Sequence, residues 1–127
     1  MKWITIILCA LLSILLLSCE KKEFYKGEYI IVNDCTVAID TYTVGRNALS
    51  IGNEFEIHDH IPANSKLSLR KIDITEKAKV KDIFVYIKMY QNGQKAIKDP
   101  MGQDIWTKTF TNNQLTYTLV VDSSFFR

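Results

Sequence analysis

A strict alternation of apolar and polar residues marks the C-terminal part of the chain. Between residues 114 and 122, apolar side chains occupy every second position, and two threonines and a valine lie between them. The apolar set is Leu115, Tyr117, Leu119 and Val121. In a β-strand, alternate side chains point to opposite faces. The segment therefore predicts a strand with one buried face.

Similar short segments recur from residue 28 onward. The expected strands are residues 29–32, 36–44, 54–58, 66–70, 83–90, 104–110 and 114–122, with a weak strand at 95–98. Asn92-Gly93 and Asn112-Asn113 are turn signals, because these residue types tolerate positive φ. Residues 73–81 are expected to hold at most one helical turn, capped by Thr75. Strands at a spacing of about 8–12 residues predict an all-β, antiparallel β-sandwich, immunoglobulin-like or related, with about seven strands.

Three strand faces follow from the same alternation. In residues 54–58, Phe55 and Ile57 are expected on the inner face. In residues 104–110, Trp106 and Phe110 are expected on one side of the strand. The densest segment, residues 83–90, is expected in the middle of a sheet. Its apolar face is Ile83, Val85, Ile87 and Met89.

The N-terminus has the composition of an export signal. Lys2 supplies a positive start, residues 3–17 carry no charge, and Ser18 and Cys19 follow. Secretory signals combine a basic start, an apolar run of about 7–15 residues and a small residue before the cleavage site. A membrane-spanning helix needs about 20 apolar residues. A cleaved signal therefore fits better, and an uncleaved N-terminal helix is the alternative.

The sequence Leu-Leu-Ser-Cys at residues 16–19 resembles the lipobox of bacterial lipoproteins. Leu16 fits the apolar position and Ser18 the small one, and the general architecture is similar to that of small Bacteroidota-type lipoproteins. The resemblance implies that the signal peptide, residues 1–18, is cleaved. Cys19 would then become the first residue, carry a diacylglyceryl thioether and be acylated on its amine. Several acyl chains bind a membrane firmly.

The resemblance also implies an organisation and a location. After the signal peptide, the lipidated cysteine and a flexible tether are expected over residues 19–27, and the β-sandwich domain over residues 28–127. The protein would be lipid-anchored in the cell envelope outside the cytoplasm, at the outer membrane as the preferred location. Its first partner would be the membrane itself.

Charge and cysteine content exclude other classes. Removing residues 1–18 leaves 15 basic and 14 acidic side chains, so no clustered basic surface and no nucleic-acid partner are expected. Cys9 would leave with the signal, and the lipid would occupy the sulfur of Cys19. Cys35 is then alone, so the fold depends on packing and not on disulfides. Cys35 is expected to be a buried, small apolar residue and not a nucleophile.

One group of residues resembles a metal site. Glu54, Glu56, His58 and His60 alternate, so a continuous strand would point all four to one face. Two histidines and a carboxylate such as Glu56 suffice for a three-ligand site. The alternative is a solvated strand face, which the apolar residues in between favour. Pro62 also puts in doubt whether the strand reaches His60. No cofactor is expected.

Aromatic residues form a second candidate site. Tyr86, Tyr90 and Trp106, together with Tyr42, would provide a platform for a sugar or a partner protein. The alternative is that these side chains fill the core.

The chain contains none of the common nucleophile, zinc-protease or phosphate-loop motifs, and is not expected to be an enzyme. We expect a membrane-anchored lipoprotein with a non-enzymatic binding or structural domain, whose partner is an envelope protein or a glycan. An alternative is a lipidated inhibitor of a cell-wall-degrading enzyme such as lysozyme, although the lack of cysteine pairs counts against it. A metal-dependent hydrolase using His58 and His60 ranks last.

Overall fold

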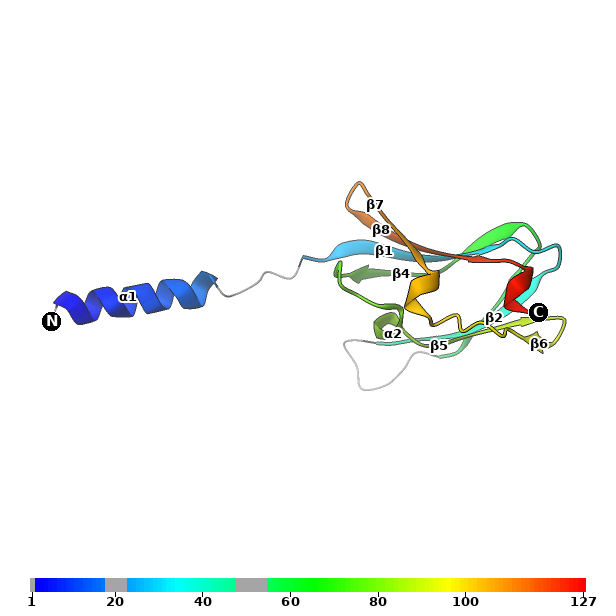
Figure 1. Cartoon of the computed structure of the whole chain (residues 1–127), viewed down its shortest axis with the longest axis horizontal. Helices are drawn as coiled ribbons and strands as arrows, with labels where there is room; N and C mark the ends of the chain where they lie inside the picture. The colour runs from blue at the N-terminus through cyan, green and yellow to red at the C-terminus, as the bar shows by residue number, and fades with distance from the viewer. Residues whose placement is uncertain (1, 18–22, 48–54) are drawn as a thin grey trace.

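The computed structural model describes residues 2–17, 23–47 and 55–127. Helix α1 spans Lys2–Leu17 and precedes the β domain (Figure 1). Among the described residues, no helix combines the length and hydropathy that crossing a membrane requires. The expectations that concern Ser18, Cys19 and Glu54 lie outside the described residues.

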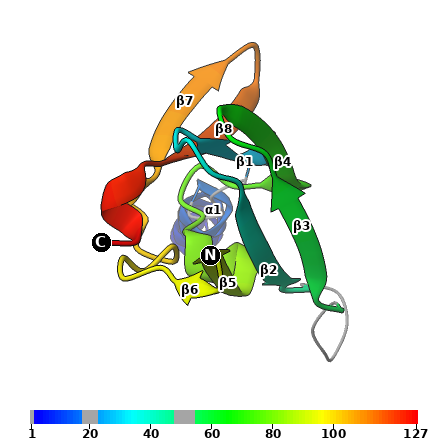
Figure 2. The same ribbon diagram turned by 90° about the vertical axis from the view of Figure 1, so that its right-hand side faces the viewer.

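The domain is an all-β sandwich of two four-stranded sheets, which confirms the predicted fold class. Sheet A has the order β4-β1-β8-β7 and sheet B the order β3-β2-β5-β6. Viewed along the strands, the sheets form two layers that approach each other at β4 and β3 (Figure 2). The strands of sheet A are β4 (Ser65–Ile74), β1 (Tyr25–Asn33), β8 (Gln114–Val121) and β7 (Thr107–Thr111). Those of sheet B are β3 (Ile57–Ile61), β2 (Ile39–Gly45), β5 (Phe84–Gln91) and β6 (Gln94–Lys95).

Three short helical segments complete the described part of the domain. They are α2 (Val80–Ile83) and two 3-10 turns, Gln103–Ile105 and Ser123–Phe125. The predicted helical turn thus lies later than expected. Lys79 and not Thr75 occupies its N-cap, where the Lys79 amide donates to the Asp82 carboxylate at 2.9 Å.

One strand pair departs from the antiparallel expectation. β1 and β8 run parallel, from Lys26 beside Gln114 to Asn33 beside Val121, whereas the other pairs are antiparallel. These are the first and last strands of the domain, so no short hairpin, which would impose an antiparallel pair, connects them. β1 also begins at Tyr25, so residues 25–27 belong to sheet A and not to the expected tether.

Alternation along β8 produces the inner face that the sequence predicts. Leu115, Tyr117, Leu119 and Val121 are all buried. Tyr29 of β1 lies at the centre of the core. Its ring stacks on Tyr117 with centroids 4.9 Å apart and meets Phe84 of the opposite sheet edge-on at 5.4 Å. Contacts of this kind join the two sheets through one aromatic cluster.

Both asparagine-containing turns form as predicted. Asn92 and Gly93 have φ of 50° and 77°, and Asn112 and Asn113 have φ of 50° and 60°. Each pair closes a two-residue hairpin, between β5 and β6 and between β7 and β8 respectively. Local sequence therefore determines these two strand connections.

The predicted inner face of the 54–58 segment is wrong. Phe55 is 94% exposed and Ile57 is 48% exposed. β3 is an edge strand whose pairing with β2 ends at Ile57 opposite Thr43, so Phe55 lies beyond the paired region. The strand instead continues through His60 to Ile61, and Ile61 is the only residue of β3 that is fully buried.

The inner face of β5 also differs from the prediction, for a local reason. In β5, Tyr86 pairs with Val44 and Phe84 with Gly45, which leaves Val85 unpaired at a bulge. Phe84 is therefore the residue that joins Ile87 and Met89 in the core, and Val85 is only partly buried.

Trp106 and Phe110 do not share an environment, contrary to expectation. The 3-10 turn at Gln103–Ile105 places Trp106 in the core before β7 begins. Phe110 lies on edge strand β7 and remains 52% exposed.

Candidate functional site

The outer face of sheet B gathers aromatic and charged side chains in rows. Across the sheet, Asp40 of β2 lies between His60 of β3 and Tyr90 of β5. In the next row, Tyr42 lies between His58 and Lys88. Their neighbours in sequence on β2 and β5, such as Thr41 and Met89, are buried, so these rows point outward. We call the set the sheet-B outer face: Asp40, Tyr42, Glu56, His58, His60, Tyr86, Lys88 and Tyr90.

Tyr42 is the centre of this surface. Its ring is parallel to that of His58, with centroids 4.4 Å apart and an angle of 6°. On the other side it meets Tyr90 edge-on, with centroids 5.7 Å apart. These two contacts fix the orientation of a half-buried aromatic side chain in the middle of the sheet.

Asp40 accepts hydrogen bonds from both histidines. Its Oδ1 atom lies 2.9 Å from Nδ1 of His60 and 3.2 Å from Nε2 of His58. An ionised carboxylate only accepts hydrogen bonds, so each facing ring nitrogen must carry its hydrogen. The hydrogen bond from His60, with a smaller contribution from His58, lowers the pKa of the Asp40 carboxyl below its usual value. Asp40 is therefore ionised at neutral pH.

Glu56 lies on the other side of the surface. It accepts a hydrogen bond from the hydroxyl of Tyr86, and this bond raises the pKa of Tyr86. Nζ of Lys88 lies 4.4 Å from the centre of the Tyr86 ring, in cation–π geometry. A hollow of about 380 Å³ lies between the group formed by Asp40 and the histidines and the pair formed by Glu56 and Tyr86. It is lined by Asp40, Tyr42, Glu56, Lys88, Tyr90 and Gly93.

The predicted metal ligands are divided between two hydrogen-bonded groups. His58 and His60 share one face of β3, as expected, but both contact Asp40, while Glu56 contacts Tyr86. Within the described ranges, no three His, Cys, Asp or Glu side chains are arranged to hold a metal ion. Sequence reasoning missed Asp40, because it lies on β2 and meets the histidines only through strand pairing.

The aromatic candidates also lie in two different places, the sheet-B outer face and the core. Tyr86 and Tyr90 lie on the sheet-B outer face, and Tyr42 lies between them and β3. Trp106 does not belong to this surface. It is buried, its Nε1 donates to the Pro100 carbonyl at 2.8 Å, and its ring meets Tyr29 edge-on. For Trp106 the alternative, a core position, is correct.

Cys35 is buried, as predicted for a small apolar residue. Its Sγ lies 3.5 Å from the Val121 carbonyl oxygen, and burial raises the pKa of the thiol. A protonated thiol in this position is a poor nucleophile.

Fold and surface together define a small all-β sandwich with an aromatic and charged face on one sheet. No family model matches the chain, and the searches of curated proteins and of solved structures likewise find no match.

Proposed function

We propose that the chain is a non-enzymatic envelope lipoprotein, anchored through Cys19, whose sandwich binds a saccharide on the sheet-B outer face. The lipobox-like residues 16–19 support the anchor. The close succession of elements also supports it, because α1 ends at Leu17 and the folded domain begins at Tyr25. Cys19 therefore lies in the sequence between the apolar helix and the folded domain, where a signal peptide would be removed.

The observation that carries the binding proposal is the hollow beside Tyr42 and Tyr90. Saccharide rings present C–H groups that pack on aromatic side chains, and their hydroxyls both donate and accept hydrogen bonds. Around this hollow, Asp40 and Glu56 supply acceptors, Lys88 supplies a donor and Tyr90 supplies a ring with a hydroxyl. Binding sites combine apolar walls with a few convergent polar groups in this way.

The hydrogen bonding of Asp40 and Glu56 favours binding over general acid catalysis. A general acid near neutral pH needs a carboxyl whose pKa is raised toward the working pH. The pKa of Asp40 is instead lowered by its histidine partners, and Glu56 already accepts a hydrogen bond from Tyr86. Both groups are suited to accept hydrogen bonds from ligand hydroxyls, and Asp40 is poorly suited to act as a general acid.

Replacement of Tyr90 tests the proposal. In titration calorimetry of the purified protein against soluble peptidoglycan fragments and a panel of polysaccharides, we expect saturable binding to at least one saccharide. Tyr90→Ala should weaken that affinity about two- to tenfold, because an aromatic contact contributes about 0.5–1.5 kcal/mol.

Ser68→Ala is the matched control, since Ser68 is an exposed residue of β4 in the other sheet. It should leave the affinity unchanged. Equal binding by wild type and Tyr90→Ala, or no saturable binding to any saccharide in the panel, would contradict the proposal.

A further inference from the structure

A second surface lies at the end of the sandwich where β1 begins. The start of β1 and the hairpin between β7 and β8 lie together at this end, nearest to α1 (Figure 1). Phe24 precedes β1 and is 65% exposed, and Phe110 of the hairpin is 52% exposed. Tyr25 meets Phe110 edge-on, with ring centroids 5.0 Å apart. Exposed large aromatic side chains gathered at one end of a small domain mark an interaction surface.

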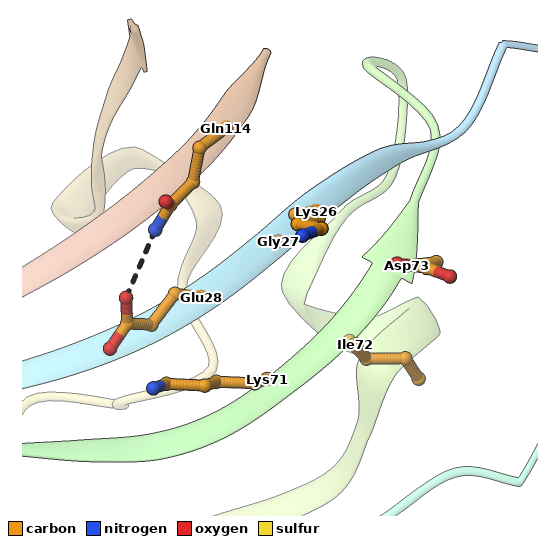
Figure 3. A pocket seen from close by; sticks show the side chains of 7 residues that line it. All are labelled: Lys26, Gly27, Glu28, Lys71, Ile72, Asp73 and Gln114. Carbon is orange, nitrogen blue, oxygen red and sulfur yellow. Dashed lines mark hydrogen bonds between the residues drawn. The ribbon is translucent and has the colours of Figure 1, made fainter. Parts of the chain in front are cut away.

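A polar hollow of about 540 Å³ lies at the same end of sheet A, where β1 pairs with β4 (Figure 3). Lys26 and Glu28 come from β1, and Lys71 and Asp73 from β4. Glu28 accepts a hydrogen bond from the Gln114 side chain at 3.1 Å. Within the described parts of the chain, neither Lys26 nor Lys71 has an ion-pair partner. Two free ammonium groups beside two carboxylates complement the phosphate and amine of a phospholipid headgroup.

A glycine forms the floor of this hollow. A Cβ atom at Gly27 would lie 2.5 Å from Cδ1 of Ile74 and 2.8 Å from the Ile72 carbonyl oxygen. The inner side of β1 is therefore closely packed against Ile74 of β4 at this position, and the side chains of Lys26 and Glu28 lie on the other side of the strand.

Chain length connects this end of the domain to the membrane, and this step rests on the proposed anchor at Cys19. Four residues lie between Cys19 and Phe24, and the five steps of a fully extended chain from one to the other span at most about 18 Å. Acyl chains on Cys19 would hold that residue at the headgroup level. The aromatic end of the sandwich is then tethered within about 18 Å of the bilayer surface.

We infer that this end of the sandwich docks on the phospholipid surface. Phe24 and Phe110 enter the interface, where aromatic side chains are favoured, and Lys26 and Lys71 contact lipid phosphates. The nine residues of β1 then rise by about 30 Å from the membrane. In this orientation the loop after Asn33 lies at the end of the domain that is far from the membrane. The sheet-B outer face then forms one side of the domain, where its ligand can reach it.

Quenching by brominated lipid tests the orientation. The lipidated protein is purified from membranes, reconstituted in phosphatidylethanolamine and phosphatidylglycerol vesicles, and compared as Phe110→Trp and Val37→Trp variants. Val37 lies in the loop that follows β1, at the far end of the strand. We expect lipid brominated near the headgroup to quench the tryptophan at position 110 several-fold more strongly than the tryptophan at position 37. Buried Trp106 gives the same background in both variants.

Phe24→Trp is a second reporter at the same end, should Phe110→Trp fail to fold. Equal quenching at both ends, or no quenching at positions 110 and 24, would overturn the docking model. Mass spectrometry of the same sample separates the two proposals. A lipidated Cys19 without quenching contradicts docking alone, whereas an unmodified Cys19 contradicts the anchor.

Discussion

Trp106→Ala is expected to lower the free energy of unfolding by about 3–5 kcal/mol, the range for truncating a large buried aromatic side chain. Trp106 is 6% exposed, meets Tyr29 edge-on at 5.8 Å and donates to Pro100 at 2.8 Å. Its removal leaves a cavity beside the central tyrosine and an unpaired carbonyl. Urea unfolding followed by circular dichroism measures the loss.

Two further variants make this prediction specific. Trp106→Phe keeps a ring in the core but loses the indole hydrogen bond, so it should cost less than Trp106→Ala. Tyr90→Ala should cost under about 1 kcal/mol, because Tyr90 lies on the outer face. A Trp106→Ala protein as stable as wild type would show that Trp106 belongs to a surface platform and not to the core.

Asn33→Ala is expected to destabilise the protein by about 3–4 kcal/mol. Asn33 is fully buried at the end of β1, and its side-chain NH₂ shares its two hydrogens among the carbonyl oxygens of Val37, Ile61 and Pro62, which lie 3.0–3.1 Å from Nδ2. Its Oδ1 accepts from the Cys35 amide at 3.0 Å. One side chain thus joins sheet A to the loop before β2 and to the end of β3. Each hydrogen bond contributes about 1 kcal/mol, and buried groups left unpaired cost more.

Asn33→Leu separates the contribution of the hydrogen bonds from that of the filled volume, in the same unfolding measurement. Leucine nearly restores the lost volume but no hydrogen bond, so it should recover only part of the stability. Asp34→Ala, at the exposed neighbouring position, should change stability by less than about 0.5 kcal/mol. If Asn33→Leu were as stable as wild type, the hydrogen bonds of Asn33 would not be what joins the sheets here.

Features that depend on a few neighbouring residues were predictable from the sequence. Asn92-Gly93 and Asn112-Asn113 form turns because their own backbone preferences suffice. The inner face of β8 follows from its alternation, because β1 pairs with this strand along its whole length. Features that depend on distant partners were not predictable. Phe55 alternates as an inward residue should, yet the pairing between β2 and β3 ends at Ile57, so Phe55 lies beyond the paired region and stays exposed.

The candidate site shows the same division. Alternation placed Tyr86 and Tyr90 together, and His58 together with His60, because each pair shares a strand. The role of Asp40 arises only when β2 pairs with β3 on one side and β5 on the other. Alternation in residues 36–44 was the available signal, since it places Asp40 and Tyr42 on one face. It does not say which strands lie beside them.

Every proposal about location depends on the chemistry of Cys19, and intact-mass spectrometry of the protein isolated from its native membranes tests it most directly. We predict a polypeptide that begins at Cys19, with a diacylglyceryl group on the sulfur and an acyl group on the amine. A chain that retains Met1, or one that carries a free thiol at position 19, would contradict the anchor and the membrane docking together.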